Sequence, residues 1–115
     1  MKDAQPVLAD MVNAIEQIRC AVGDRGLAEY ASDWLLKRAV ERGIEIVSEA
    51  SRRLPDSMKA AYPQIPWRRV AGMGNVLRHN YDSIVDEVIY DVVRNELPAV
   101  QTVLHSMQQS AEKPK

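Results

Sequence analysis

The stretch from Trp34 to Leu54 reads WLLKRAVERGIEIVSEASRRL, and its pattern indicates most clearly how this chain folds. Apolar residues recur every three or four positions, which places them along one face of a helix. Pro55 follows directly and cannot continue a helix, so we predict one long amphipathic helix over this stretch. Its apolar face comprises Leu35, Leu36, Ala39, Val40, Gly43, Ile46, Val47, Ala50 and Leu54.

Helical spacing continues on both sides of this stretch. No segment alternates between apolar and polar residues with the period of two that is typical of a strand. We expect Val88 on the inner face of its helix and a kink at Pro98. The sequence therefore predicts an all-α fold, an up-and-down bundle of four to five helices. The expected helices span residues 7–22, 34–54, 66–79, 83–92 and 97–107, with shorter turns at 27–31 and 56–61.

Length and composition narrow the class of protein. The 115 residues suit one domain, which we expect over residues 1–110 with a flexible tail at 111–115. Hydrophobic residues make up 46% and charged residues 27%, as in soluble globular proteins. There is no apolar run of about 20 residues and no secretory leader pattern, and the single cysteine, Cys20, cannot form an internal disulfide. We therefore expect a cytoplasmic protein that uses neither a metal nor a cofactor.

Charge is unevenly distributed although the formal net charge is only −1. Residues 51–81 carry six cations and one acid, whereas residues 82–96 carry five acids and one cation. A basic segment of this kind can attract phosphate groups. It is equally consistent with solvated helix faces that pair with the acidic segment. The candidate phosphate-binding residues are Arg52, Arg53, Arg68 and Arg69.

The expected helix over residues 66–79 is unusual because it contains two glycines, Gly72 and Gly74. Two glycines inside a helix cost about 2 kcal/mol relative to alanine, so we expect a close backbone approach there. Helical geometry places four residues on one line, which we call the polar stripe. The polar stripe consists of Arg68, Gly72, Asn75 and His79.

An arginine, an amide and an imidazole on one helix face are what cleavage of RNA without a metal needs. A histidine with a pKa near neutrality can take the proton from a ribose 2′-hydroxyl, and a guanidinium can hold the phosphate as charge develops. The residues alone leave a second interpretation open. A histidine at the end of a helix, such as His79, also interacts favourably with the helix dipole.

Three motifs in the chain resemble the HepT-like branch of the HEPN superfamily. Residues 65–81 read IPWRRVAGMGNVLRHNY and are similar to the pattern IPW-x5-MRN-x3-H-x-Y of that branch. Residues 42–54 are similar to its pattern R-x-LEIIGEAA-x-RL, and residues 95–98, NELP, to its NDLP. The resemblance covers residues 4–104 and keeps the motifs in order.

The resemblance implies a helical bundle that forms a homodimer and cleaves RNA at the dimer cleft without a metal. HepT-like members are toxins of type VII toxin–antitoxin pairs, and their antitoxin is a minimal nucleotidyltransferase. In some pairs the antitoxin adds AMP to the tyrosine two residues after the motif histidine. Carried over to this chain, the histidine is His79, which acts as base or acid, Asn75 orients it, and Tyr81 is the modified tyrosine.

The chain departs from the family pattern at one position. The motif arginine, five residues before the histidine, is replaced by Gly74. Arg78 is the candidate for the missing cation, from the same helix or from the partner subunit. The alternative is that the chain is a catalytically weak or inactive HEPN module, which binds and regulates a partner nucleotidyltransferase.

Overall fold

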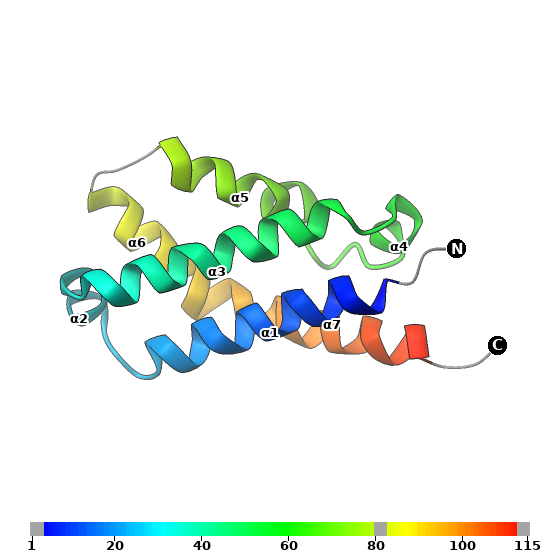
Figure 1. Cartoon of the computed structure of the whole chain (residues 1–115), viewed down its shortest axis with the longest axis horizontal. Coiled ribbons are helices and arrows are strands. Elements are labelled where there is room, and N and C mark those ends of the chain that lie inside the picture. The colour runs from blue at the N-terminus through cyan, green and yellow to red at the C-terminus, as the bar shows by residue number, and fades with distance from the viewer. Residues whose placement is uncertain (1–3, 80–82, 113–115) are drawn as a thin grey trace.

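The computed structural model describes residues 4–79 and 83–112, and within these ranges every element is a helix (Figure 1). This confirms the predicted all-α class. The short α2 and α4 connect the longer helices. The elements are α1 (Gln5–Val22), α2 (Leu27–Ser32), α3 (Trp34–Arg52), α4 (Asp56–Ala60), α5 (Trp67–His79), α6 (Ser83–Asp91), the π-helical segment η1 (Val92–Glu96) and α7 (Leu97–Glu112).

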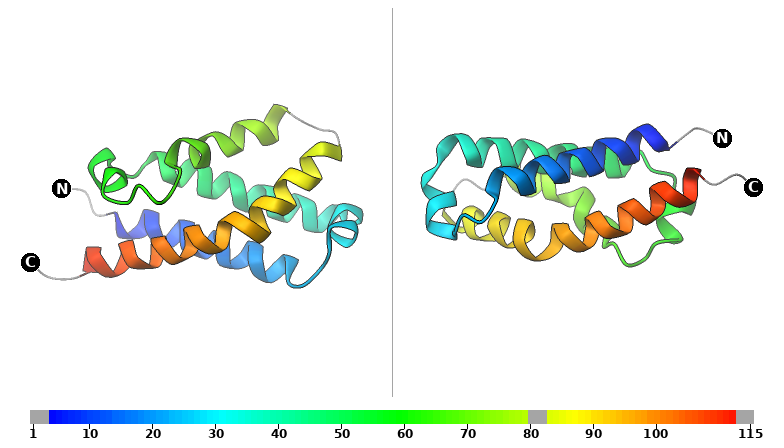
Figure 2. Two further views of the ribbon diagram at one scale, coloured as in Figure 1. Left: turned by 180° about the vertical axis from the view of Figure 1, so that it is seen from behind. Right: turned by 90° about the horizontal axis from the view of Figure 1, so that it is seen from below.

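Four long elements run alternately up and down, as predicted (Figures 1 and 2). They are α1, α3, α5 and the continuous rod formed by α6, η1 and α7. The main helix contacts join α1 to α3, α3 to α5, and α1 to α7. The long helix identified from the sequence, α3, therefore lies between α1 and α5 and positions both.

Local signals in the sequence set the helix ends. The Asp33 carboxylate accepts a hydrogen bond of 3.0 Å from the backbone N–H of Leu36 and caps the start of α3. Gly23 ends α1 with a φ of 54°, a conformation that glycine adopts without strain. α3 ends at Arg52, two residues before the expected boundary.

The kink expected at Pro98 takes the form of a π-helical turn. Proline has no backbone N–H, so Pro98 cannot make the usual bond to the carbonyl four residues earlier. The chain lengthens its preceding turn instead, and the N–H of Leu97 donates to the carbonyl of Val92, five residues back. The helix then resumes as α7 and continues to Glu112, five residues past the end expected for this helix at residue 107.

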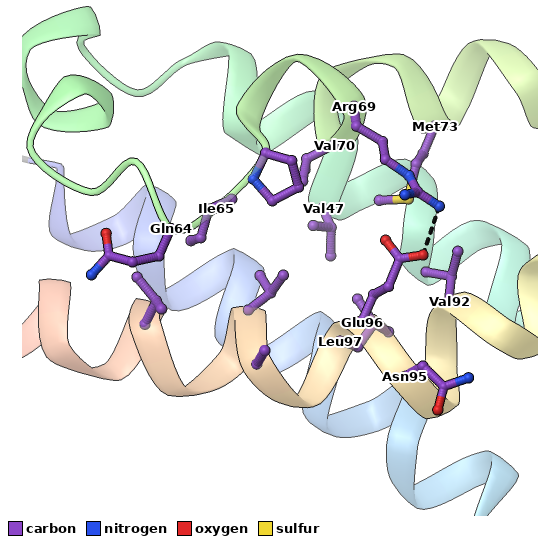
Figure 3. Close-up of a pocket in the computed structure, with 14 residues that line it drawn as sticks. Val47, Gln64, Ile65, Arg69, Val70, Met73, Val92, Asn95, Glu96 and Leu97 are labelled. Carbon is purple, nitrogen blue, oxygen red and sulfur yellow. Dashed lines mark hydrogen bonds and ion pairs between the residues drawn. The ribbon is translucent and has the colours of Figure 1, made fainter.

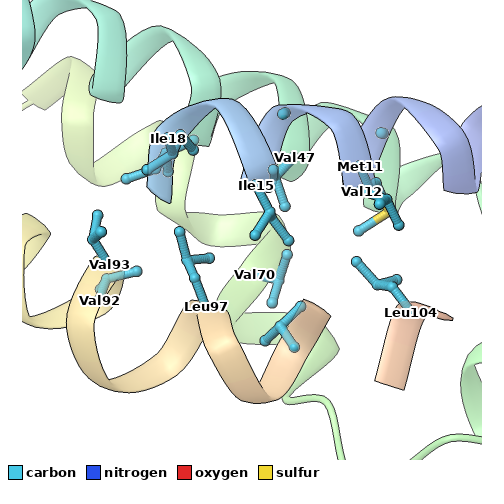
Figure 4. Packing of buried hydrophobic residues seen from close by; sticks show 14 of the residues in the cluster. Met11, Val12, Ile15, Ile18, Val47, Val70, Val92, Val93, Leu97 and Leu104 are labelled. Carbon is cyan, nitrogen blue, oxygen red and sulfur yellow. The ribbon is translucent and has the colours of Figure 1, made fainter. Parts of the chain in front are cut away.

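The core lies between α1, α3 and α7, with contributions from α5 and η1 (Figure 4). Gly43 lets α1 and α3 approach each other closely, because a Cβ atom at this position would lie 2.6 Å from Cγ1 of Ile18. The largest fully buried side chains include Leu8, Met11, Ile15, Ile44, Leu97, Leu104 and Met107.

Three residues expected on apolar inner faces are exposed instead. Leu35 is 73% exposed, Val88 is 45% exposed and Ala39 is also exposed, so the prediction was wrong for all three. Leu36, next in the chain, is buried at 6%. An apolar stripe wider than the contact with neighbouring helices leaves its edge residues in solvent, and only the rotation of the helix decides which ones these are.

Tyr30 on α2 is completely buried, and its hydroxyl has no hydrogen-bond partner among the described residues. Its ring centroid lies 5.7 Å from that of Tyr90. Burial raises the pKa of Tyr30 above its usual value, the negative charges of Glu41 and Asp86 raise it further, and Arg38 opposes them. The hydroxyl is therefore held neutral and costs desolvation energy without compensation.

Replacing Tyr30 with phenylalanine is expected to raise the free energy of unfolding by about 1 kcal/mol at pH 7, because it removes an unpartnered buried hydroxyl. The unfolded tyrosine ionises near pH 10, whereas the pKa of the folded one is raised. Wild type should therefore lose stability as the pH rises above about 10, and the variant should lack this part of the loss. Urea unfolding of wild type and variant at pH 7 and above pH 10 measures both effects.

The control for this prediction is Tyr62→Phe. The Tyr62 hydroxyl donates a 3.0 Å hydrogen bond to Oγ of Ser110 at an exposed site, so its removal should leave stability unchanged or slightly lower. A Tyr30→Phe variant that is less stable than wild type at pH 7 would contradict the expected gain.

Candidate functional site

The polar stripe lies on α5, the helix that packs on the far side of α3 from α1 (Figure 1). Its described side chains, Arg68 and Asn75, are exposed. His79 is the last residue of α5. The side chains of Arg78 and His79, and the whole of Tyr81, lie outside the described part of the chain. The structure therefore shows the backbone that carries the candidate catalytic residues and the surface before them.

The two glycines of α5 have different surroundings. Nothing lies within 4 Å of the place that a Cβ atom would take at Gly72, so the expected close approach is not found there within the described chain. Gly74 is buried, and its backbone N–H donates a hydrogen bond of 3.3 Å to Oγ of Ser48 on α3. The close backbone approach between α5 and α3 is therefore found at Gly74 and not at Gly72.

Ser48 and Arg52 of α3 both bind the backbone of α5. The Ser48 hydroxyl, only 1% exposed, donates a hydrogen bond of 2.7 Å to the carbonyl of Ala71. Nη2 of Arg52 donates a second one of 2.5 Å to the same oxygen. Sequence reasoning missed Ser48, because a small residue at helical spacing looks like part of an apolar face. Its signal is the four-residue spacing to Arg52, which places both on one face of α3.

The four candidate phosphate-binding arginines are not gathered into one patch. Nη2 of Arg53 lies 3.6 Å from the Asp10 carboxylate on α1, so Arg53 points away from α5. Nη2 of Arg69 lies 2.6 Å from the carboxylate of Glu96, a residue of the acidic segment. For Arg53 and Arg69, the interpretation as cations paired with acidic side chains therefore describes the structure better.

A cavity of about 230 Å³ lies between the first turns of α5 and the η1–α7 rod (Figure 3). Its walls are mainly apolar, with Val47, Val70 and Val92 among them, and the Arg69–Glu96 ion pair joins α5 to η1 beside it. The volume is below the range of about 300–1,000 Å³ that ligand pockets usually have. We interpret the cavity as a packing gap and not as a substrate site.

A shallower apolar groove of about 350 Å³ runs along α5 between this helix and α6. Val76 on α5 and Val88 on α6 line it and are 46% and 45% exposed. Gly72, with its open surroundings, lies on the same groove. The groove therefore offers apolar surface directly beside the polar stripe.

Across residues 4–79 and 83–112, no three His, Cys, Asp or Glu side chains lie close enough together to hold a metal ion. None of the described helices is both long and apolar enough to cross a membrane.

Comparison with known proteins identifies the family. The family described as Ribonuclease HepT-like matches residues 11–107. A protein of Methanocaldococcus jannaschii named "Putative RNase" is 33% identical over 97 residues, which cover 84% of this chain and 80% of that protein. A protein of Thermococcus cleftensis named "Probable ribonuclease HepT" is 32% identical over 94 residues, which cover 82% of this chain and 86% of that protein. No solved structure matches the chain.

The matched segment contains all of the polar stripe and both residues of α3 that bind α5. It spans most of the chain, and the relatives are aligned over most of their own length. Together with the all-helical up-and-down fold, this shows that the chain belongs to the Ribonuclease HepT-like family of the HEPN superfamily.

Proposed function

We propose that this chain is a metal-independent endoribonuclease and the toxin of a type VII toxin–antitoxin pair, acting in the cytoplasm. The observation that carries the proposal is the placement of Asn75 on an exposed face of α5, one helical turn before His79, within a chain of the HepT-like family. These are the positions of the polar residue and the histidine in the family pattern.

The proposed reaction uses the RNA strand's own 2′-hydroxyl as nucleophile. His79 takes the proton of that hydroxyl, the 2′-oxygen attacks the neighbouring phosphorus, and the bond to the 5′-oxygen breaks. The products are a 2′,3′-cyclic phosphate and a 5′-hydroxyl, which needs one proton from an acid. Asn75 orients the imidazole, and Arg78 stabilises the negative charge on the phosphate.

We propose that the active form is a homodimer, with the apolar groove beside α5 in the interface. The exposed Val76 and Val88 support this, because burying apolar surface is the main driving force of association. We further propose a minimal nucleotidyltransferase as antitoxin and Tyr81 as the tyrosine that it modifies with AMP. Modification two residues after His79 would add negative charge beside the phosphate site and repel RNA.

Cleavage of a labelled RNA pool by the purified chain in EDTA tests the proposal. Wild type, confirmed by mass to carry no AMP, is expected to produce fragments ending in cyclic phosphate. Arg78→Ala should lower the rate by about 100-fold, since one stabilising donor is lost. The matched control is Arg42→Ala, because Arg42 is an exposed arginine of α3 that pairs with Glu45. Equal cleavage rates for the two variants would show that Arg78 takes no part in the reaction.

One observation favours a second function. Gly74, where the family pattern has arginine, is buried against Ser48 and brings no side chain to the stripe. A chain without that cation could serve as a binding module that docks and regulates a nucleotidyltransferase. No cleavage by unmodified wild type, together with a stable complex with the transferase, would select this second function.

A further inference from the structure

Arg52 differs from the other candidate arginines in what holds its guanidinium. Its Nη2 donates to the Ala71 carbonyl of α5, a neutral group, and the residue is exposed. Arg53 and Arg69 face the carboxylates of Asp10 and Glu96. Among the described residues no carboxylate pairs with Arg52. Its positive charge is therefore fixed in place without being neutralised there.

The guanidinium lies beside the part of α5 that leads to the candidate catalytic residues. Asn75 follows Ala71 by four residues, which is about 6 Å along the helix axis, and His79 follows it by about 12 Å. A helical carbonyl points toward the C-terminal end, so the oxygen bound by Arg52 lies between the levels of Ala71 and Asn75. A phosphate on the exposed face of α5 near Asn75 is within the reach of this guanidinium.

The same turn of α5 is where the chain lacks a cation of its own. Gly74 follows Ala71 by three residues, and its N–H is bound to Ser48, one helical turn before Arg52 on α3. Ser48 therefore binds both ends of this segment of α5, the Ala71 carbonyl and the Gly74 N–H, and Arg52 binds the Ala71 end. A positive charge that α5 does not supply at Gly74 is supplied from α3.

The bound state of Arg52 leaves donors for a ligand. A guanidinium has five N–H donors in a planar fork, and the Ala71 carbonyl takes one of them. Because the Ala71 bond already fixes the side chain, less conformational entropy is lost when a phosphate binds. Exposure on the solvent side gives an anion access to the remaining donors.

We propose that Arg52 is a phosphate-binding residue, which holds a backbone phosphate of an RNA strand lying along the exposed face of α5. This inference rests on the proposed function and assigns a fixed cation, on a second helix, to the site of Asn75 and His79. In the family pattern R-x-LEIIGEAA-x-RL, Arg52 falls on the variable position just before the second arginine of the pattern, which is Arg53 in this chain.

Binding of an uncleavable 2′-O-methyl oligoribonucleotide tests the proposal without depending on catalysis. Arg52→Gln removes the charge but keeps a donor for the Ala71 carbonyl, whereas Arg52→Lys keeps the charge and loses the planar fork. We expect Gln to weaken binding at least about tenfold and to lower the slope of log K against log salt by about 0.7. Lys should retain most of the affinity. Arg42→Gln, about 15 Å along α3 from Arg52 and beside α1, is the control.

Two further measurements distinguish an effect of Arg52 on folding from an effect on the RNA site. Thermal unfolding should show the same midpoint for Arg52→Gln and Arg52→Lys as for the Arg42→Gln control to within a few degrees, since both positions are exposed. In the cleavage assay, Arg52→Gln should lower kcat by about 100-fold while Arg52→Lys loses less.

The outcomes separate this inference from the proposed function. Wild type that binds the oligoribonucleotide through Arg52 but cleaves no RNA would end the nuclease proposal and support the phosphate site. Wild type that does not bind it, or an Arg52→Gln variant that binds as well as Arg42→Gln, would overturn the phosphate site. Arg52 would then only fasten α5 to α3.

Discussion

His79→Ala is expected to lower the rate of RNA cleavage by 100-fold or more, about the contribution of a general base or acid to catalysis. The substitution removes the only group on the polar stripe that can exchange a proton near neutral pH. The measurement is the initial rate on labelled RNA in EDTA. Because His79 is the last residue of α5, its replacement should leave the folding of the chain intact.

His105→Ala is the matched control for this experiment. The chain contains two histidines, and His105 is exposed and lies on α7, a different helix from the polar stripe. The His105→Ala variant should cleave RNA at the wild-type rate. If His79→Ala and His105→Ala cleave RNA equally fast, cleavage does not depend on His79, and the proposed catalytic site on α5 is wrong.

Leu104→Ala is expected to lower the free energy of unfolding by about 2–5 kcal/mol, the usual range for removing a leucine side chain from a packed core. Leu104 is completely buried on α7, on the side that faces α1 (Figure 4). Domains of this kind have about 5–15 kcal/mol of stability in total, so the variant loses a large part of it. The urea midpoint followed by circular dichroism measures the loss.

Leu35→Ala makes the same chemical change at the surface. Leu35 is 73% exposed, so its replacement should change stability by no more than about 0.5 kcal/mol. A small loss for Leu104→Ala, or a loss as large for Leu35→Ala, would contradict the packing described above. The second result would indicate that Leu35 is covered by another copy of the chain.

The helices were predictable because their signals are local. A helix brings residues three and four apart onto one face, so the apolar spacing of residues 34–54 is enough to identify α3 without knowledge of its neighbours. Breaks are equally local, since Gly23 and Pro55 act through their own backbone geometry. Most boundaries were accurate to about two residues, as for α3, which ends at Arg52, whereas α7 runs five residues past its expected end at residue 107.

The candidate site was predictable only where it lies on one helix. Asn75 and His79 are four residues apart, and helical geometry puts them on one stripe in any fold that keeps α5. For the basic segment, the sequence left open whether its cations form one phosphate-binding surface or pair with acids, and in the structure Arg53 and Arg69 face carboxylates of other helices. Their partners, Glu96 and Asp10, lie 27 and 43 residues away in the sequence, and local spacing cannot predict such distant pairs.

Local spacing thus specifies the order, the limits and the apolar faces of the helices, because these depend on backbone geometry within a few residues. The rotation of each helix in the bundle decides the rest, and it depends on contacts between distant segments. It buries Leu36 and leaves Leu35 in solvent. It also brings Ser48 and Arg52 of α3 to the Ala71 carbonyl of α5, and Ser48 to the N–H of Gly74 three residues further on.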